Sequence, residues 1–242
     1  MVPTLILLHG FTQTGASWEP VRAALGERYR ALAPDIRGHG RASELEPVTV
    51  EAVRADVAAL TTGPFELAGY SMGGRIALHV GLAEPERVRR LILIGASPGI
   101  ADPAERAARR EADERLASEI SVLGIEQFAQ RWAETPVLAG QPHDVRAAAH
   151  ADRLRNTTAG LARALRGLGT GELPPLWGRI GELRMPVALV AGERDSKFTA
   201  IAEQMAGAIA EVELTIVPGA GHAVHLEAPV GVAAAIAAQD IW

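Results

Sequence analysis

The serine at position 71 stands in a pattern typical of catalytic serines. Gly69, Ser71 and Gly73 form a G-x-S-x-G motif. The run Phe65–Ala68 before the motif is apolar, and Arg75–Ala83 after it has helical spacing of its apolar residues. A strand that turns sharply into a helix exposes the serine hydroxyl, and the glycines are needed because the tight turn leaves no room for side chains. The pattern predicts a nucleophile elbow at Ser71.

A serine hydroxyl becomes reactive when a histidine takes its proton and a carboxylate orients that histidine. His222 lies in a Gly-rich loop after the last apolar run, and His225, three residues later, is the alternative. Asp195 follows the penultimate apolar run, and Glu193 is the alternative acid. We expect Ser71, Asp195 and His222 to form a catalytic triad.

Such a site also needs donors for developing negative charge. One is expected to be the backbone N–H of Met72, the residue after the serine. The other is expected to be the N–H of Phe11, in the loop after the first strand. These two groups predict an oxyanion hole.

Short, nearly continuous apolar runs recur along the chain. Such runs are typical of parallel strands, because both faces of these strands are covered. The expected strands are Thr4–His9, Arg30–Ala33, Phe65–Ala68, Arg90–Ile94, Val187–Ala191 and Glu213–Val217. The helical stretches between and after them are Trp18–Leu25, Val50–Leu60, Arg75–Ala83, Phe198–Ala210 and Val230–Ala238. This alternation predicts an α/β fold with a parallel sheet covered on both faces.

The segment 99–177 breaks the alternation. It is rich in Ala, Arg and Glu, and its patterns are helical, without a convincing strand. A structureless segment of this length would be implausible inside a compact domain. We therefore expect a helical cap that covers Ser71, inserted into a core made of residues 1–98 and 178–242.

Composition narrows the class of protein. The chain has 242 residues, of which 48% are hydrophobic, so it can bury a substantial core. A net charge of −5 disfavours a nucleic-acid partner, and no apolar run is long enough for stable membrane insertion. There are no cysteines, which excludes disulfides and thiolate chemistry. We expect a cytoplasmic enzyme that acts on a small molecule.

With these motifs placed, the chain resembles the α/β-hydrolase superfamily. Several stretches are similar in particular to the MenH family, the 2-succinyl-6-hydroxy-2,4-cyclohexadiene-1-carboxylate synthases of menaquinone biosynthesis. The stretches are 8–11, 69–75, 97–99, Trp132 with 135–137, 192–198 and 220–229. In one respect the chain departs from the superfamily. It begins in the strand before His9 and Gly10, so we expect the usual two N-terminal strands to be absent, leaving a wholly parallel sheet with Arg30–Ala33 at one edge.

The resemblance implies an elimination instead of a hydrolysis. Members of that family expel pyruvate from 2-succinyl-5-enolpyruvyl-6-hydroxy-3-cyclohexene-1-carboxylate. By this resemblance Ser71, activated by His222 and Asp195, would act as a base that removes a carbon-bound proton. The resemblance implies neither a metal nor an organic cofactor.

A substrate with three carboxylates needs cationic partners, and arginine suits carboxylates well. Arg75 lies four residues after Ser71, near the positive end of a helix, where a cation is disfavoured unless an anion lies nearby. The alternative is an ordinary salt bridge. Arg109 and Lys197 match cationic positions of the family, although Arg109 also fits a solvated, ion-paired helix face. Further expected substrate-binding residues are Tyr70 and Trp132, which could equally be packing residues.

Two other functions remain open at this point. A carboxylesterase or carbon–carbon bond hydrolase would use Ser71 as a nucleophile with the same triad. A non-enzymatic ligand receptor on this fold would have no need of the triad. A cationic pocket favours the lyase and an apolar pocket favours the esterase. The sequence does not indicate an oligomeric state.

Overall fold

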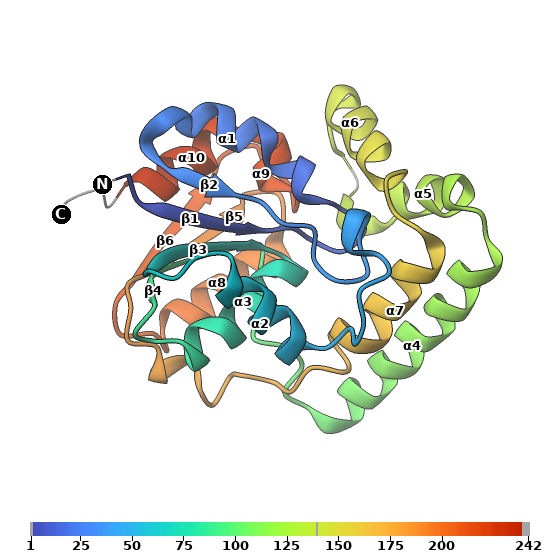
Figure 1. Cartoon of the computed structure of the whole chain (residues 1–242), viewed down its shortest axis with the longest axis horizontal. Helices are drawn as coiled ribbons and strands as arrows, with labels where there is room; N and C mark the ends of the chain where they lie inside the picture. The colour runs from blue at the N-terminus through green and yellow to red at the C-terminus, as the bar shows by residue number, and fades with distance from the viewer. Residues whose placement is uncertain (1, 139, 239–242) are drawn as a thin grey trace.

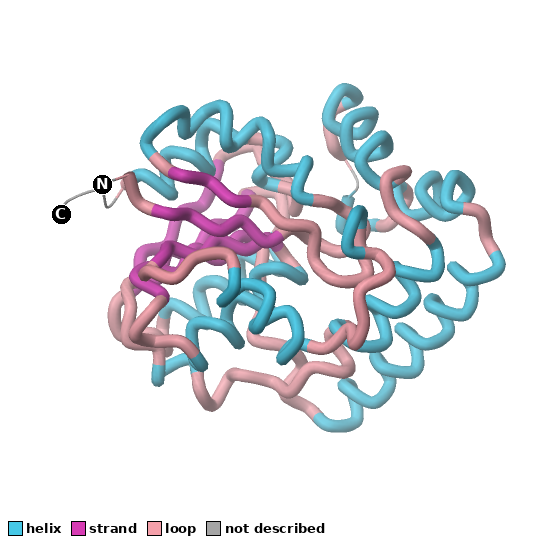
Figure 2. The backbone as a smooth tube through the Cα atoms, viewed as in Figure 1, coloured by secondary structure: helices cyan, strands magenta, loops and turns pink. Residues whose placement is uncertain are grey.

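A six-stranded, wholly parallel sheet forms the centre of the protein in a computed structural model, which describes residues 2–138 and 140–238 (Figure 2). Its strands lie in the order β2-β1-β3-β4-β5-β6. Their bounds are β1 Thr4–Leu8, β2 Arg30–Leu32, β3 Phe65–Tyr70, β4 Val88–Ile94, β5 Val187–Gly192 and β6 Val212–Val217. The predicted parallel sheet, with residues 30–32 at one edge, is therefore confirmed.

Helices cover both faces of this sheet (Figure 1). One face carries α1 Glu19–Leu25, α9 Val224–Glu227 and α10 Pro229–Ala237. The other carries α2 Val50–Ala59, α3 Met72–Ala83 and α8 Ser196–Ala206. Each face has its own apolar core, with Trp18 and Ile236 buried on the first and Ile76 and Met205 on the second. Because both faces are buried, the strands consist of almost uninterrupted apolar residues.

Four helices between β4 and β5 form a separate group at one end of the sheet (Figure 1). They are α4 Pro103–Val122, α5 Ile125–Ala133, α6 His143–Arg153 and α7 Thr158–Leu168. A small apolar cluster that includes Phe128 and Leu161 holds α4, α5 and α7 together. No strand occurs in the described part of the segment 99–177. The division into core and cap at residues 98 and 178 stays a prediction.

The element ends differ from the predicted ends by a few residues, for local reasons. The third strand continues to Tyr70 because Gly69 and Tyr70 pair with Leu93 and Ile94 of β4. The helix after Asp195 ends at Ala206, before the predicted Ala210, since the chain leaves the helix at the C-cap Gly207. Trp18 belongs to a short 3₁₀ turn that precedes α1. Four further 3₁₀ turns are Gly26–Arg28, Gly40–Ala42, Pro136–Leu138 and Ile180–Glu182.

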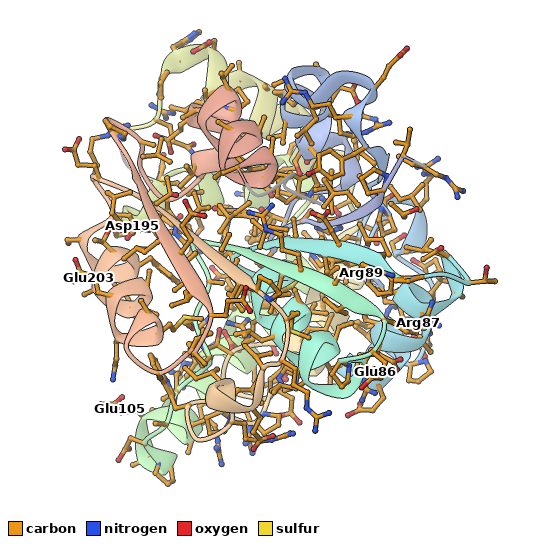
Figure 3. All side chains as sticks on the ribbon, turned by 90° about the vertical axis from the view of Figure 1, so that its left-hand side faces the viewer. Glu86, Arg87, Arg89, Glu105, Asp195 and Glu203 are labelled. Carbon is orange, nitrogen blue, oxygen red and sulfur yellow. The ribbon has the colours of Figure 1, made fainter. Side chains whose placement is uncertain are left out.

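The charged side chains around β3 and β4 lie away from the expected catalytic acid. Figure 3 shows Asp195 beside α8, on the opposite side of the view from Arg87 and Arg89. Arg87 donates to the carbonyl of Ala58 at 3.1 Å and packs over the ring of Phe65. Arg87 therefore supports the fold at the far side. Among the described helices, none has the length and apolar character needed to cross a membrane.

Candidate active site

Ser71 is held in a sharp turn between β3 and α3. Its φ of 51° lies in the left-handed region, which a non-glycine residue rarely adopts. The flanking glycines make this turn possible: a Cβ on Gly69 would lie 2.3 Å from the carbonyl oxygen of Gly73, and one on Gly73 would lie 2.2 Å from that of Leu8. The predicted strand–turn–helix geometry is present at this serine, and its conformation costs roughly 1–3 kcal/mol that the surrounding packing must offset.

A chain of hydrogen-bonding side chains runs from Ser71 through His222 to Asp195. The distance from Ser71 Oγ to His222 Nε2 is 3.2 Å, and the distance from His222 Nδ1 to Asp195 Oδ2 is 2.6 Å. His222 and Asp195 are both almost buried, with side-chain exposures of 5% and 9%. In this arrangement His222 can take the serine proton while the carboxylate stabilises the resulting imidazolium. The structure thus brings the three predicted residues together.

Asp195 is fixed by the start of α8, and the alternative acid is engaged elsewhere. Asp195 is the N-cap of α8, where its Oδ1 accepts a hydrogen bond from the N–H of Phe198 at 3.3 Å. Its Oδ2 is the oxygen that contacts His222 Nδ1. Glu193 instead accepts from the N–H of Gly219 at 2.8 Å. The geometry therefore selects Asp195 over Glu193 as the partner of the histidine.

His225 is a fully buried ring that does not reach the serine. It lies between the rings of Trp18 and Tyr70, with centroid distances of 4.8 and 4.1 Å. Burial, and secondarily the neighbouring His222, lowers the pKa of His225 to about 3, so this ring is neutral. Of the two candidate histidines, only His222 is bonded to Ser71.

The two expected oxyanion donors flank Ser71. Met72 is the first residue of α3, so its N–H has no acceptor within the helix. Phe11 lies in the loop after β1 and lines the same cavity as Ser71. These positions suit donors that stabilise negative charge, and their catalytic role stays a prediction.

A cavity opens at Ser71. It is lined by Phe11, Thr12, Gln13, Tyr70, Ser71, Trp132, Val137, Leu138, Gln141, Arg153, His222 and Leu226. Trp132 packs edge-on against Phe11 at 5.1 Å. Burial, followed by the charges of Asp195 and Glu227, raises the pKa of Tyr70, so its hydroxyl remains a donor. Both predicted aromatic residues therefore line the cavity.

Arg153, at the end of α6, is the cation that lines this cavity, and the sequence did not single it out. The residue is only 4% exposed, yet its Nε and Nη1 have no hydrogen-bond partner within the described ranges. Burial lowers its pKa, while Tyr70 and Asp152 act in the opposite direction. A buried guanidinium with free donors is suited to an anion. No spacing rule could have found it, because α6 is brought to Ser71 by tertiary packing alone.

Arg75 is buried against the end of α7 and does not line the cavity at Ser71. Its Nη2 lies 3.5 Å from the carbonyl oxygen of Leu168, and its Nε has no partner among the residues described. Burial, with Arg109 as the second cause, lowers its pKa to about 10. Asp113 opposes this shift through its charge but forms no hydrogen bond to Arg75, and its Oδ1 accepts from Arg109. The expected contact of Arg75 with substrate stays a prediction.

Arg109 and Lys197, the other two predicted cations, lie outside the cavity at Ser71. Arg109 donates from Nε to Asp113 Oδ1 at 2.8 Å, and 45% of its side chain is exposed. Lys197 is exposed, with its Nζ 5.7 Å from the ring centroid of Phe198. Neither residue lines the cavity at Ser71, and their roles in substrate binding stay predictions.

A larger groove lies elsewhere, between α4 and α7. Four of its charged residues are paired with one another, Arg166 with Glu114 and Arg110 with Glu172. Glu111 and Asp113 pair with Arg115 and Arg109. The bonds from Arg166 and Ser118 lower the pKa of Glu114 to about 2. Because these groups neutralise one another and the groove holds no nucleophile, the smaller cavity at Ser71 is the better candidate site. Within the described residues, no group of three or more His, Cys, Asp or Glu side chains could hold a metal ion.

The sheet, the elbow and the Ser–His–Asp contacts define an α/β-hydrolase. The chain belongs to the alpha/beta hydrolase family, which matches residues 5–235. It is 32% identical to the 2-succinyl-6-hydroxy-2,4-cyclohexadiene-1-carboxylate synthase of Enterobacter sp. (strain 638), over 97% of this chain and 90% of that protein. A Bacillus subtilis (strain 168) protein provisionally named for the same activity is 37% identical, over 93% of this chain and 85% of its own length.

A solved structure has nearly the same shape. MenH from S. aureus superposes with a TM-score of 0.93 and is 29% identical, with 98% of this chain and 93% of that chain covered. The similarity extends over the whole fold, the helices α4–α7 included, since so little of either chain is left unmatched. MenH from S. aureus therefore shares both the sheet and the helices α4–α7 of this chain.

Proposed function

We propose that this protein is a 2-succinyl-6-hydroxy-2,4-cyclohexadiene-1-carboxylate synthase. It removes pyruvate from 2-succinyl-5-enolpyruvyl-6-hydroxy-3-cyclohexene-1-carboxylate, as its relatives' names and the sequence resemblance indicate. The observation that carries the proposal is the buried, unpaired guanidinium of Arg153 in the cavity of Ser71. An esterase for neutral substrates would have no use for a desolvated cation at that place.

In the proposed reaction Ser71 acts as a base. Its hydroxyl proton moves to His222 Nε2, 3.2 Å away, and the serine oxygen removes a proton from carbon. The electron pair left on carbon enters the ring conjugation and breaks the carbon–oxygen bond to the enolpyruvyl group. The expelled enolate takes up one proton to become pyruvate, and His222 returns to its neutral form when it releases the proton it received.

Groups on both sides of Ser71 stabilise the charges that form on His222 and on the substrate. Asp195, 2.6 Å from His222 Nδ1, stabilises the imidazolium. The N–H groups of Phe11 and Met72 stabilise the negative charge that develops on the substrate. Arg153 binds one of the three substrate carboxylates, and Tyr70 donates from its hydroxyl.

A carboxylesterase is the second candidate, because the same elbow and triad suit nucleophilic attack by Ser71. The two functions are separated by supplying purified protein with the enolpyruvyl precursor and, in parallel, with p-nitrophenyl acetate. The proposal predicts rapid release of pyruvate and slow hydrolysis of the ester. Rapid ester hydrolysis without pyruvate release would support the esterase and reject the lyase.

A further inference from the structure

The loop that carries Phe11 contains a strained residue. Thr12 has a φ of 70°, in the left-handed region, which is an outlier for a β-branched side chain. It is 1% exposed and lines the cavity beside Ser71. A conformation of this kind persists only where neighbouring groups hold it. Such strain next to a candidate oxyanion donor indicates that neighbouring groups hold the loop in a conformation that positions Phe11.

The backbone of Thr12 is held on both sides. Its N–H donates to His39 Nε2 at 3.4 Å, and its carbonyl oxygen accepts from Asn156 Nδ2 at 2.8 Å. Asn156 is 4% exposed and also accepts from the N–H of Gly40 at 3.0 Å. This one side chain, from the segment between α6 and α7, therefore fastens two loops that follow strands of the core.

Asp152 fastens the same loop two residues further on. Its Oδ2 accepts from the N–H of Thr14 at 2.9 Å, and its Oδ1 accepts from Thr14 Oγ1 at 2.5 Å. The hydroxyl of Thr14 in turn accepts from the N–H of Ala16 and so caps the 3₁₀ turn Gly15–Trp18. Both oxygens of this nearly buried carboxylate are thus occupied by one threonine.

Asp152 and Asn156 lie on either side of Arg153 in sequence, and Asn156 Nδ2 also donates to the carbonyl oxygen of Arg153 at 3.1 Å. A single turn at the end of α6 therefore holds both the loop of Phe11 and the backbone of the arginine that faces Ser71. Neither Asp152 nor Asn156 lines the cavity.

We propose that Asp152 and Asn156 are positioning residues that clamp the loop 11–14 in its strained conformation. They point the N–H of Phe11 toward the reacting centre, and they hold Arg153 at a fixed position relative to that centre. This inference rests on the proposed function only in treating Phe11 as an oxyanion donor and Arg153 as an anion-binding residue. It makes the cap a part of the catalytic geometry.

The test compares Asp152→Ala and Asn156→Ala with a matched control. Arg163→Met breaks another link between α7 and the core, since Arg163 donates to the carbonyl oxygen of Ser43 at 2.6 Å and to Glu44 at 3.0 Å, but that link does not touch the loop. The alanine variants should lower kcat for pyruvate release about 10- to 100-fold, because a displacement near 1 Å at a reacting centre costs up to that much. KM should change less than kcat. Arg163→Met should leave kcat unchanged.

A conservative variant separates position from charge. Asp152→Asn keeps an oxygen for the N–H of Thr14 and offers an amide to its Oγ1, so it should recover most of the loss in Asp152→Ala. If Asp152→Asn is as impaired as Asp152→Ala, the carboxylate acts through its charge and the clamp is rejected for this residue.

Two readouts do not need the substrate. Hydrogen exchange of the amides of residues 11–14 should accelerate in both alanine variants and stay as in the unmodified protein in Arg163→Met. Phosphonylation of Ser71 by diisopropyl fluorophosphate depends on the oxyanion donors. It should slow in both alanine variants and stay unchanged in Arg163→Met. Unchanged exchange in both alanine variants overturns the clamp, whatever the activities. If the unmodified protein releases no pyruvate but exchange is faster in the alanine variants, the proposed function is rejected and the proposed clamp is retained.

Discussion

At the scale of single residues, the site depends on side chains that are distant in sequence. Ser71 and His222 are 151 positions apart, and Asp195 is 27 positions from His222, yet each contact is within hydrogen-bond distance. Each of the three follows the end of a strand, and the ends of parallel strands meet at one edge. Chain order and motif spacing therefore sufficed to predict which side chains meet, and their catalytic roles stay predictions.

The first prediction concerns the acid. Asp195→Asn should lower kcat about 10³- to 10⁴-fold, because an amide cannot stabilise the imidazolium and favours the wrong tautomer of His222. Glu193→Gln is the matched control, since Glu193 binds Gly219 and does not contact the histidine. Steady-state kinetics on purified variants checks both. Comparable losses in the two variants would contradict the assignment of Asp195.

The second prediction concerns the cations. Arg153→Ala should lower kcat/KM for the tricarboxylate about 10- to 100-fold, the worth of a lost charged hydrogen bond, and should change hydrolysis of p-nitrophenyl acetate much less. Arg75→Ala tests the sequence-based assignment in the same assay. If Arg75→Ala affects both substrates equally, Arg75 supports the fold and does not bind substrate; if Arg153→Ala does so, Arg153 is not the anion-binding residue.

Among the elements, the sheet was predictable, whereas the packing of α4–α7 onto it was not. Buried parallel strands show as apolar runs because both faces are covered, so β1 to β6 could be found within a few residues. The helices of the cap could be predicted as helices, but their packing onto the core depends on side-chain contacts distant in sequence, such as those of Asn156 with Thr12. For this reason Arg153 was missed.

The turn at Ser71 is the element on which the site depends most. Gly73→Ala should destabilise the protein by roughly 2 kcal/mol or more, because the new Cβ would lie 2.2 Å from the carbonyl oxygen of Leu8 and the backbone must move. Gly178→Ala is the control: nothing lies within 4 Å of its Cβ, and its effect should stay within ~0.5 kcal/mol. Urea unfolding measures both. Equal stability of the two variants would contradict the close packing of the elbow.

At the scale of the whole molecule, several buried histidines link stability to pH. Burial lowers the pKa of His39 and His225 to about 3 and that of His79 to about 4, whereas an unfolded histidine titrates near 6.5. The folded state thus binds fewer protons than the unfolded state between these values. The stabilising contribution is present above pH ~6.5 and is lost as the pH falls toward the folded pKa values.

The free energy of unfolding should therefore decrease from pH 7 to pH 5, with each such histidine adding up to ~1.4 kcal/mol per pH unit to the slope. His225→Phe, which keeps an aromatic ring between Trp18 and Tyr70, should show a shallower slope. Urea titrations at several pH values provide the measurement. An unchanged slope in His225→Phe would show that His225 titrates in the folded protein as it does in the unfolded chain, which contradicts the lowered pKa.

In the proposed reaction Ser71 takes a proton from an anionic substrate and pyruvate is expelled. This reaction is measured by following pyruvate and the conjugated cyclohexadiene together, with the unmodified protein and with Ser71→Ala. We expect equal amounts of both products from the unmodified protein, and a rate reduced by at least ~10³-fold in the variant. Absence of the diene with the unmodified protein, or undiminished formation of both products by Ser71→Ala, would contradict it.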